Sequence, residues 1–201
     1  MADYRDLLPI IKKWEGGYVN DPDDSGGATN KGVTLSTFRQ FYGKDKTAED
    51  LKKLTDAQWL YIFLNGYWDK MKASQINNQA IANIIVDWAW ASGPGTAAKY
   101  VQNIVGVDAD GIVGPQTLQA INTAPQNSLF DKIKSARIKF VEQLAELRPK
   151  DKKFLNGWKN RINSFFFSSS AASEALQNYG ILAGLAVLCI ILISRKKWKR
   201  L

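Results

Sequence analysis

The residues best suited to chemistry lie in one glycine-rich segment near the N-terminus, where Glu15 is followed by two glycines. Glu15 falls at the predicted end of an apolar helix, and Asp21 and Asp24 follow six and nine residues later. A carboxyl group fixed at a helix end can act as a general acid that protonates a leaving oxygen, for example in a glycosidic bond. Breaking such a bond also needs a second carboxylate or a positioned water on the other face of the sugar. Asp21 and Asp24 are candidates for that second group.

Two threonines of the same segment, Thr29 and Thr34, are candidates to hold a nucleophilic water. A water held by a loop acid or a threonine favours inversion at the sugar, so we expect an inverting mechanism. A segment rich in Asp, Asn and Gly can also simply turn the chain or bind calcium. This one lacks the spacing and the bidentate glutamate of an EF-hand, so we expect no metal site, and we expect no cofactor.

The composition excludes several classes of enzyme. The sequence contains no histidine, which rules out Ser-His-Asp triads, Cys-His dyads and histidine zinc sites. Cys189 is the only cysteine, so the chain has neither an internal disulfide nor a thiolate zinc cluster. The acid–base chemistry of an enzyme without a cofactor must then use carboxylates, lysine or tyrosine.

The net charge of +8 is unevenly distributed along the chain. Residues 165–201 contain five basic residues and one acid, and therefore carry half of it. A mildly basic body suits an anionic polymer, although such a surplus can also serve solubility alone. No nucleic-acid-binding module is recognisable, so we expect no nucleic acid as a partner, and we expect a monomer.

Helical signals dominate residues 1–163. Asp6 is a candidate helix cap with Pro9 in the first turn, and Thr55 to Gln58 has the spacing of a capping box. Residues 18–34 combine Asp, Asn, Gly and Pro with short Val/Thr pieces, which predicts a loop with a small β-hairpin. Further helices are predicted at 37–42, 48–53, 59–64, 78–91, 96–105, from 115, at 128–147 and at 152–165. The predicted fold class is mainly α with one small N-terminal hairpin.

The tryptophans can belong either to the core or to a sugar-binding wall. At helical spacing we expect Trp59, Trp88 and Trp90 in the core. Trp68 follows a glycine and a tyrosine and is the best candidate for a cleft wall, where its ring can stack on a sugar. The segment DGIVGPQT, which begins at Asp110 and Gly111, can either face a ligand or simply connect two helices of one core.

Several of these motifs together resemble the signature of glycoside hydrolase family 108, the lysozyme-type muramidases of phages and bacteria. The motifs are WEGGYVNDP (14–22), Asp24, GG (26–27), Thr29, GVT (32–34), YW (67–68), Asp87, SGPG (92–95), DGIVGP (110–115) and Thr117. The resemblance covers about residues 4–162. Its last part is similar to the C-terminal peptidoglycan-binding half of that family.

The resemblance implies a lysozyme-like α+β fold and cleavage of the glycan strands of peptidoglycan. By position, Glu15 matches the catalytic glutamate, and Asp21 and Asp24 match the loop acids. Thr29 and Thr34 match the threonines of the family's hairpin. The residues expected to bind substrate are Tyr18, Trp68, Asp110 and Gly111.

The predicted organisation has five parts. Residues 1–85 form a catalytic half with the acid loop and hairpin, and residues 86–163 a peptidoglycan-binding-like helical half. A Ser-rich linker follows at 164–174. Residues 175–194 carry no charge and precede the basic tail 195–201. Twenty helical residues span about 30 Å, the hydrocarbon thickness of a bilayer, so we predict a transmembrane helix at 175–194.

The basic tail predicts the orientation of that helix. The positive-inside tendency places the tail in the cytoplasm and the body beside periplasmic peptidoglycan. The N-terminal residues lack the pattern of a signal peptide, so a tail that crosses the membrane is an alternative. Moving five positive charges through hydrocarbon costs about 2.5–3.5 kcal/mol each, which opposes that alternative. We expect a single-pass protein of the bacterial inner membrane or of the internal membrane of a phage virion, with the body acting on periplasmic peptidoglycan.

Two other functions share this substrate. A lytic transglycosylase would use Glu15 as both acid and base and release anhydro-sugar ends. A non-catalytic, membrane-tethered protein would bind peptidoglycan without cleaving it, although the intact Glu15 segment argues against this. The leading expectation is a muramidase that serves phage lysis or entry.

Overall fold

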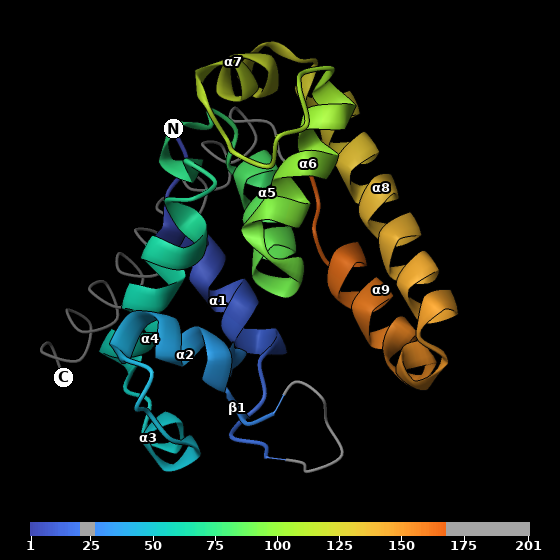
Figure 1. Cartoon of the computed structure of the whole chain (residues 1–201). Coiled ribbons are helices and arrows are strands. Elements are labelled where there is room, and N and C mark those ends of the chain that lie inside the picture. Colours follow the sequence, from blue (N-terminus) through green and yellow to red (C-terminus); the bar gives the residue numbers. More distant parts are fainter. Residues whose placement is uncertain (21–26, 168–201) are drawn as a thin grey trace, which may run out of the picture. The chain divides into compact units, whose positions relative to one another are not determined.

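The computed structural model describes residues 1–20 and 27–167 (Figure 1). Its α-helices are α1 Tyr4–Trp14, α2 Leu35–Tyr42, α3 Ala48–Lys52, α4 Asp56–Phe63, α5 Gln79–Ser92, α6 Pro94–Val105, α7 Pro115–Thr123, α8 Gln126–Leu147 and α9 Leu155–Asn163. Strands β1 Thr29–Asn30 and β2 Val33–Thr34 pair antiparallel. The other helical turns are the π-helix η1 Leu64–Trp68 and the 3-10 helices η2 Ala73–Gln75 and η3 Pro149–Phe154. A mainly helical fold with one small antiparallel hairpin confirms the expected α+β class.

Helix α1 begins earlier than the sequence predicts. Asp3 is its cap, because the carboxylate of Asp3 accepts a hydrogen bond from a backbone N–H of the first turn at 2.9 Å. Asp6 therefore lies inside the first turn, and Pro9 lies in the interior of the helix. The apolar face of α1 is as expected, since Leu7 and Ile11 are fully buried.

The hairpin is confirmed, and its turn has a defined geometry. Lys31 and Gly32 connect β1 to β2 with φ values of 49° and 77°. Two successive positive φ angles are typical of a type I′ turn, whose twist matches that of the flanking strands. Thr29 lies opposite Thr34 in the ladder. The side-chain amide of Asn30 donates to two carbonyls at the end of α3, at 2.9 and 3.1 Å, and so fixes the hairpin to that helix.

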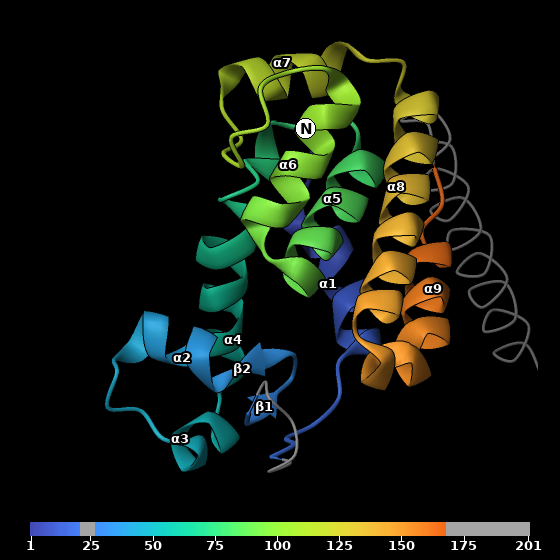
Figure 2. The same ribbon diagram turned by 45° about the vertical axis from the view of Figure 1, so that its right-hand side comes forward.

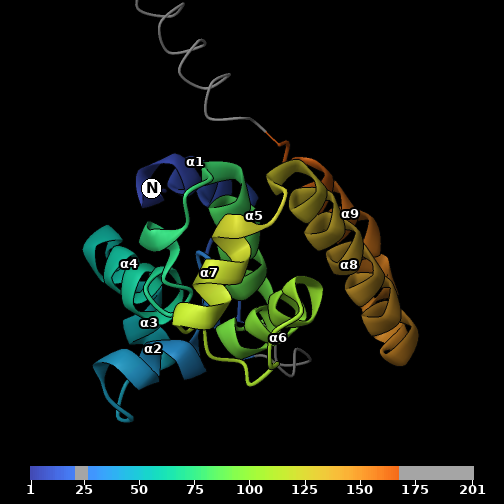
Figure 3. The same cartoon turned by 90° about the horizontal axis from the view of Figure 1, so that it is seen from above.

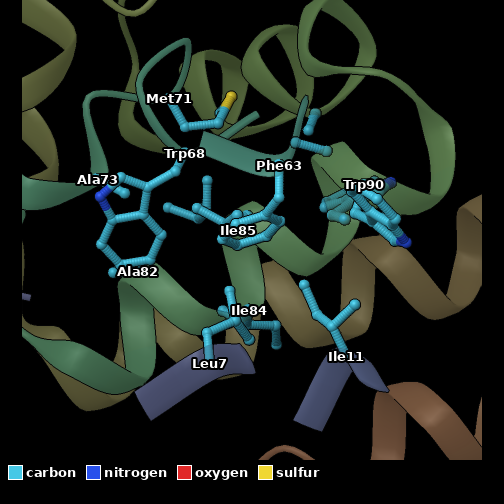
Figure 4. Close-up of a cluster of buried hydrophobic side chains, with 14 of the residues drawn as sticks. Leu7, Ile11, Phe63, Trp68, Met71, Ala73, Ala82, Ile84, Ile85 and Trp90 are labelled. Atoms are coloured by element: carbon cyan, nitrogen blue, oxygen red, sulfur yellow. The ribbon is translucent and has the colours of Figure 1, made fainter. Parts of the chain in front are cut away.

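Helix α5 lies at the centre of the described body. Every residue from Ala80 to Trp90 is buried, and a helix that is apolar nearly all round must be enclosed by other elements. It contacts α1, α6 and α8, and Figure 3 shows these helices around it. Figure 4 shows Leu7 and Ile11 of α1 beneath Ile84 and Ile85 of α5.

A network of ion pairs joins α8 and α9 to α5. Asp87 on α5 is fully buried, and two arginines contact its carboxylate. Arg137 of α8 lies 2.6 Å away and Arg161 of α9 lies 2.7 Å away. Figure 2 shows α8 and α9 side by side. A buried carboxylate needs such partners because its desolvation is otherwise too costly.

The body continues beyond α9 to Phe167. Phe165 is only 3% exposed, and the ring of Phe167 lies 5.9 Å from that of Phe130. Residues 164–167, which the sequence assigned to the start of the linker, therefore pack with the body.

The described residues contain no candidate for a membrane span. No helix within 1–20 and 27–167 is both long and apolar enough to cross a bilayer. The predicted transmembrane helix at 175–194 and the basic tail 195–201 lie outside the described residues, as does the linker from residue 168.

Replacing Asp87 with asparagine removes the charge that Arg137 and Arg161 share. Breaking a buried pair leaves uncompensated charge, so we expect the free energy of unfolding to fall by about 3–5 kcal/mol. Denaturant unfolding followed by circular dichroism measures this loss. The matched control is Glu142→Gln, which removes an exposed 2.7 Å ion pair with Lys159 that also links α8 to α9. The control should lose little stability, and equal losses would contradict the prediction.

Candidate active site

Glu15 directly follows α1, and two other helices hold its carboxylate. The side chain is 13% exposed. Trp90 of α5 donates its indole N–H to Oε1 at 2.8 Å, and Arg161 of α9 donates from Nη1 to the same oxygen at 2.9 Å. Both hydrogen bonds that the described side chains make to Glu15 therefore end on Oε1. Three elements that are distant in sequence meet at this carboxylate.

The hairpin turn approaches the same carboxylate very closely. A Cβ on Gly32 would collide with Oε2 of Glu15 and would lie 2.6 Å from its Cδ and 3.0 Å from Nε1 of Trp90. Gly32 also has a φ of 77°, which other residues adopt only with strain. Glycine is therefore required here for two independent reasons, and the turn forms a wall against Glu15 and Trp90.

Glu15 opens into a cavity of about 280 Å³. The other lining residues are Lys12, Lys31, Asp56 and Trp59. Lys31 pairs with Asp56 at 2.7 Å, and the ammonium of Lys12 lies 5.6 Å from the centre of the Trp59 ring. The cavity thus places two cations beside the candidate acid, against the largely buried ring of Trp59.

The two arginines of the network have different electrostatic environments. Burial lowers the pKa of Arg137, and Asp87 only partly offsets this. Burial also acts to lower the pKa of Arg161, but the charges of Asp87 and Glu15 together outweigh it, so this pKa lies above its ordinary value. Arg161 therefore stays charged between the two carboxylates that it bridges.

Tyr67, which the sequence places in the YW motif without a role of its own, lies against Trp90, a donor to the candidate acid. Its ring centre is 4.7 Å from that of Trp90. Burial raises the pKa of Tyr67, a hydrogen bond with Thr37 acts in the opposite direction, and the charge of Glu15 adds to the rise. In the Tyr-Trp pair it is therefore the tyrosine whose ring contacts Trp90 and whose pKa responds to the charge of Glu15.

The two hairpin threonines are brought together, and they make local hydrogen bonds. Thr34 caps α2, because its hydroxyl oxygen accepts from the backbone N–H of Thr37 at 3.1 Å. The hydroxyl of Thr29 donates to the carbonyl of Gly27 at 3.3 Å. Asp21 and Asp24 lie outside the described residues. The catalytic roles of these four residues stay predictions from the sequence.

The predicted role of Trp68 as a cleft wall needs correction. Trp68 is only 1% exposed and donates its indole N–H to Ser74 at 2.7 Å, so no sugar can stack on it. It packs within the core at the end of η1. Tyr18 is partly buried, with the ammonium of Lys52 lying 5.6 Å from its ring centre.

Asp110 and Gly111, also predicted to bind substrate, form a self-contained turn between α6 and α7. Asp110 accepts from the N–H of Ile112 and from Gln102, and these bonds hold the pKa of Asp110 below its ordinary value. Gly111 has a φ of 86° and donates to Gln102 at 2.9 Å. Figures 1 and 2 place α7 at the end of the body opposite the hairpin. The turn itself packs against α6, because a Cβ on Gly111 would lie 3.3 Å from the carbonyl oxygen of Gly95.

The partners of Glu15 could not be found from local patterns. The sequence predicts Trp90 in the core, and the structure confirms this, since Trp90 is only 8% exposed. Its single polar atom nevertheless reaches the acid. Arg161 lies 146 residues from Glu15, and its segment has no motif that points to the N-terminal loop. Only the folded chain connects them.

Comparison with known proteins identifies the families that this chain resembles. The family model described as glycosyl hydrolase 108 matches residues 8–93, which contain Glu15, the hairpin and Trp90. The family described as a predicted peptidoglycan domain matches residues 96–163, which contain Arg161. The structure of Brucella abortus SagA is similar, with a TM-score of 0.71 and 29% identity over 84% of this chain and 97% of that chain. No curated protein matches the chain.

Replacing Gly32 with alanine should displace the Glu15 carboxylate, because the new methyl group collides with it. Misplacing a catalytic group by about 1 Å can cost about 100-fold, so we expect a loss of that order in the rate of peptidoglycan cleavage. The control is Gly27→Ala. It carries a similar backbone strain at φ 70°, but its Cβ meets no described atom within 4 Å. Comparable activity in the two variants would contradict the steric argument.

Proposed function

Since the chain belongs to the glycosyl hydrolase 108 family, we propose that it is a lysozyme-type muramidase that uses Glu15 as its general acid. The family match and the peptidoglycan domain make it a peptidoglycan-degrading glycosidase. The observation that carries the assignment of Glu15 is its carboxylate, mostly buried, held by two donors and open to a cavity.

The reaction assigns a proton transfer to Glu15. Its carboxyl group gives a proton to the glycosidic oxygen as the bond to the sugar carbon breaks, and a water adds to that carbon. The proton lost by the water must pass to a second group. Our candidates for the group that accepts this proton are the carboxylates of Asp24 and Asp21. Thr29 or Thr34 is our candidate to hold the water. The proposed outcome is inversion at the sugar.

The charges around the cavity support an acidic glycan polymer as substrate. Lys12 and Lys31 place two ammonium groups beside Glu15, whereas Asp56 neutralises only one of them directly. Peptide stems of peptidoglycan carry carboxylates, which a cationic rim attracts. Trp59 also lines this cavity, but it is only 2% exposed and its indole N–H donates to the carbonyl of Lys31, so it acts as a wall of the cavity rather than as a stacking surface.

Replacing Glu15 with glutamine keeps the shape of the side chain but removes its exchangeable acid proton. General acid catalysis contributes about 10²–10⁴-fold, so we expect the clearing of a cell-wall suspension to slow by that factor. Glu142→Gln, an exposed carboxylate on α8, is the matched control and should retain the wild-type rate. Clearing by Glu15→Gln at the wild-type rate would remove Glu15 from its proposed role.

The products of the same digestion separate the remaining activities. A muramidase releases new reducing ends, whereas a lytic transglycosylase releases anhydro-sugar ends, which mass spectrometry resolves. A protein that only binds would sediment with cell walls and release neither product. Anomer-resolved NMR of the first product then tests inversion.

We further propose that residues 175–194 anchor the enzyme in a membrane, with residues 1–167 facing peptidoglycan during phage lysis or entry. The support is the charge-free run and the basic cluster that follows it. We expect the full chain to sediment with membranes on ultracentrifugation, and a chain ending at residue 167 to remain in the supernatant. A full chain that stays in the supernatant without detergent would contradict the anchor. Protease added to spheroplasts should digest the body, and protection of the body would reverse the orientation.

A further inference from the structure

We propose that Arg161 is a positioning residue for Glu15, so that the C-terminal half takes part in the catalytic step. This inference rests on the proposed role of Glu15 as general acid. Arg161 lies on α9, inside the range that matches the predicted peptidoglycan domain. The residues that match the glycosyl hydrolase model end at 93, so the catalytic half alone lacks this donor.

The guanidinium of Arg161 uses separate atoms for its two acidic partners. Nη1 donates to Oε1 of Glu15 at 2.9 Å. Nη2 donates to Oδ1 of Asp87 at 2.7 Å, and Nε lies 3.0 and 3.2 Å from the two Asp87 oxygens. A planar group with fixed donors can hold two carboxylates at a set distance and angle, which a lysine ammonium cannot do.

Arg161 is itself held in place from the opposite side. Asp87 is fully buried on the central helix, and Arg137 donates to its Oδ2 at 2.6 Å. The side chain of Arg161 is 13% exposed, and its departure would remove one of the two cations that compensate the buried charge of Asp87. Two contacts therefore connect Glu15 to α5. One runs through Arg161 to Asp87, and the other is the hydrogen bond from Trp90.

The hydrogen bonds also distinguish the two oxygens of Glu15. Oε1 accepts from both Arg161 and Trp90, whereas Oε2 lies against Gly32 in the hairpin turn. A protonated carboxyl group carries its single proton on one oxygen, and an oxygen already facing two donors is the wrong place for it. We therefore assign proton delivery to Oε2, with Arg161 and Trp90 fixing the rotation of the carboxyl group.

The test compares two lysine substitutions in the full chain, Arg161→Lys and Arg137→Lys. Both keep a positive charge beside Asp87, but only the first removes a donor from Glu15. Kinetics on soluble, uncrosslinked glycan strands should show kcat of Arg161→Lys reduced about 10–100-fold with KM changed less than about twofold. Arg137→Lys should lose a similar amount of thermal stability with a much smaller change in kcat. Lys159→Gln, two residues before Arg161 on α9, should keep wild-type kinetics.

A second matched pair covers the case in which Arg161→Lys does not fold. The triple substitution Asp87→Asn, Arg137→Gln and Arg161→Gln exchanges the charged network for neutral amides and removes the donor from Glu15. The double substitution Asp87→Asn with Arg137→Gln exchanges the pair of Asp87 and Arg137 in the same way but leaves Arg161 on Glu15. The proposal predicts the lower kcat for the triple variant.

The outcomes separate this inference from the proposed function. Equal kcat in the two members of a matched pair, together with an inactive Glu15→Gln enzyme, overturns the positioning role and leaves the general acid in place. A fall in kcat that is the same for Arg161 and Arg137 variants assigns both to stability alone and also overturns it. Full activity of Glu15→Gln removes the proposed acid, and the inference then falls with it.

Discussion

The charge of Asp87 is the constraint on which the C-terminal half and the active site both depend. A carboxylate with no exposed surface is tolerated only when its charge and its oxygens are compensated. Arg137 and Arg161 supply this from two different helices, and so fix α8 and α9 against α5. Arg161 also pairs with Glu15. The arginine that compensates the buried charge of Asp87 therefore also contacts the candidate acid.

Close packing imposes a second constraint on the other side of Glu15. The type I′ turn brings the backbone of Gly32 against the carboxylate, and no side chain fits between them. Asn30 fixes the hairpin to the end of α3, so the turn does not depend on two short strands for its position. The acid is thus confined between a backbone wall and two donors, an arrangement that limits its rotamers.

Local signals predicted the elements well because the forces that begin and end them are local. The capping box at Thr55 and Gln58 forms both of its hydrogen bonds, and Pro115 opens α7 where its missing N–H costs little. The hairpin followed from its turn residues. Asp6 was misjudged as a cap because Asp3 offers the same chemistry three residues earlier. Such errors move a boundary but leave the fold class intact.

The site was less predictable because its geometry is set by contacts between distant segments. The motif identified Glu15, but nothing local distinguishes the buried Trp68 from Tyr67 beside the site, or Trp90 from other core tryptophans. Arg161 lies 146 residues from Glu15, so no motif spacing in the sequence could predict that the two residues are in contact.

Buried ion pairs seldom stabilise a protein more than apolar residues of the same volume, because desolvation cancels much of the attraction. The placement of Arg161 and Asp87 is therefore better explained by what they orient than by stability alone. Apolar side chains could fill the same space between α5, α8 and α9, but they would offer no donor to Oε1 of Glu15.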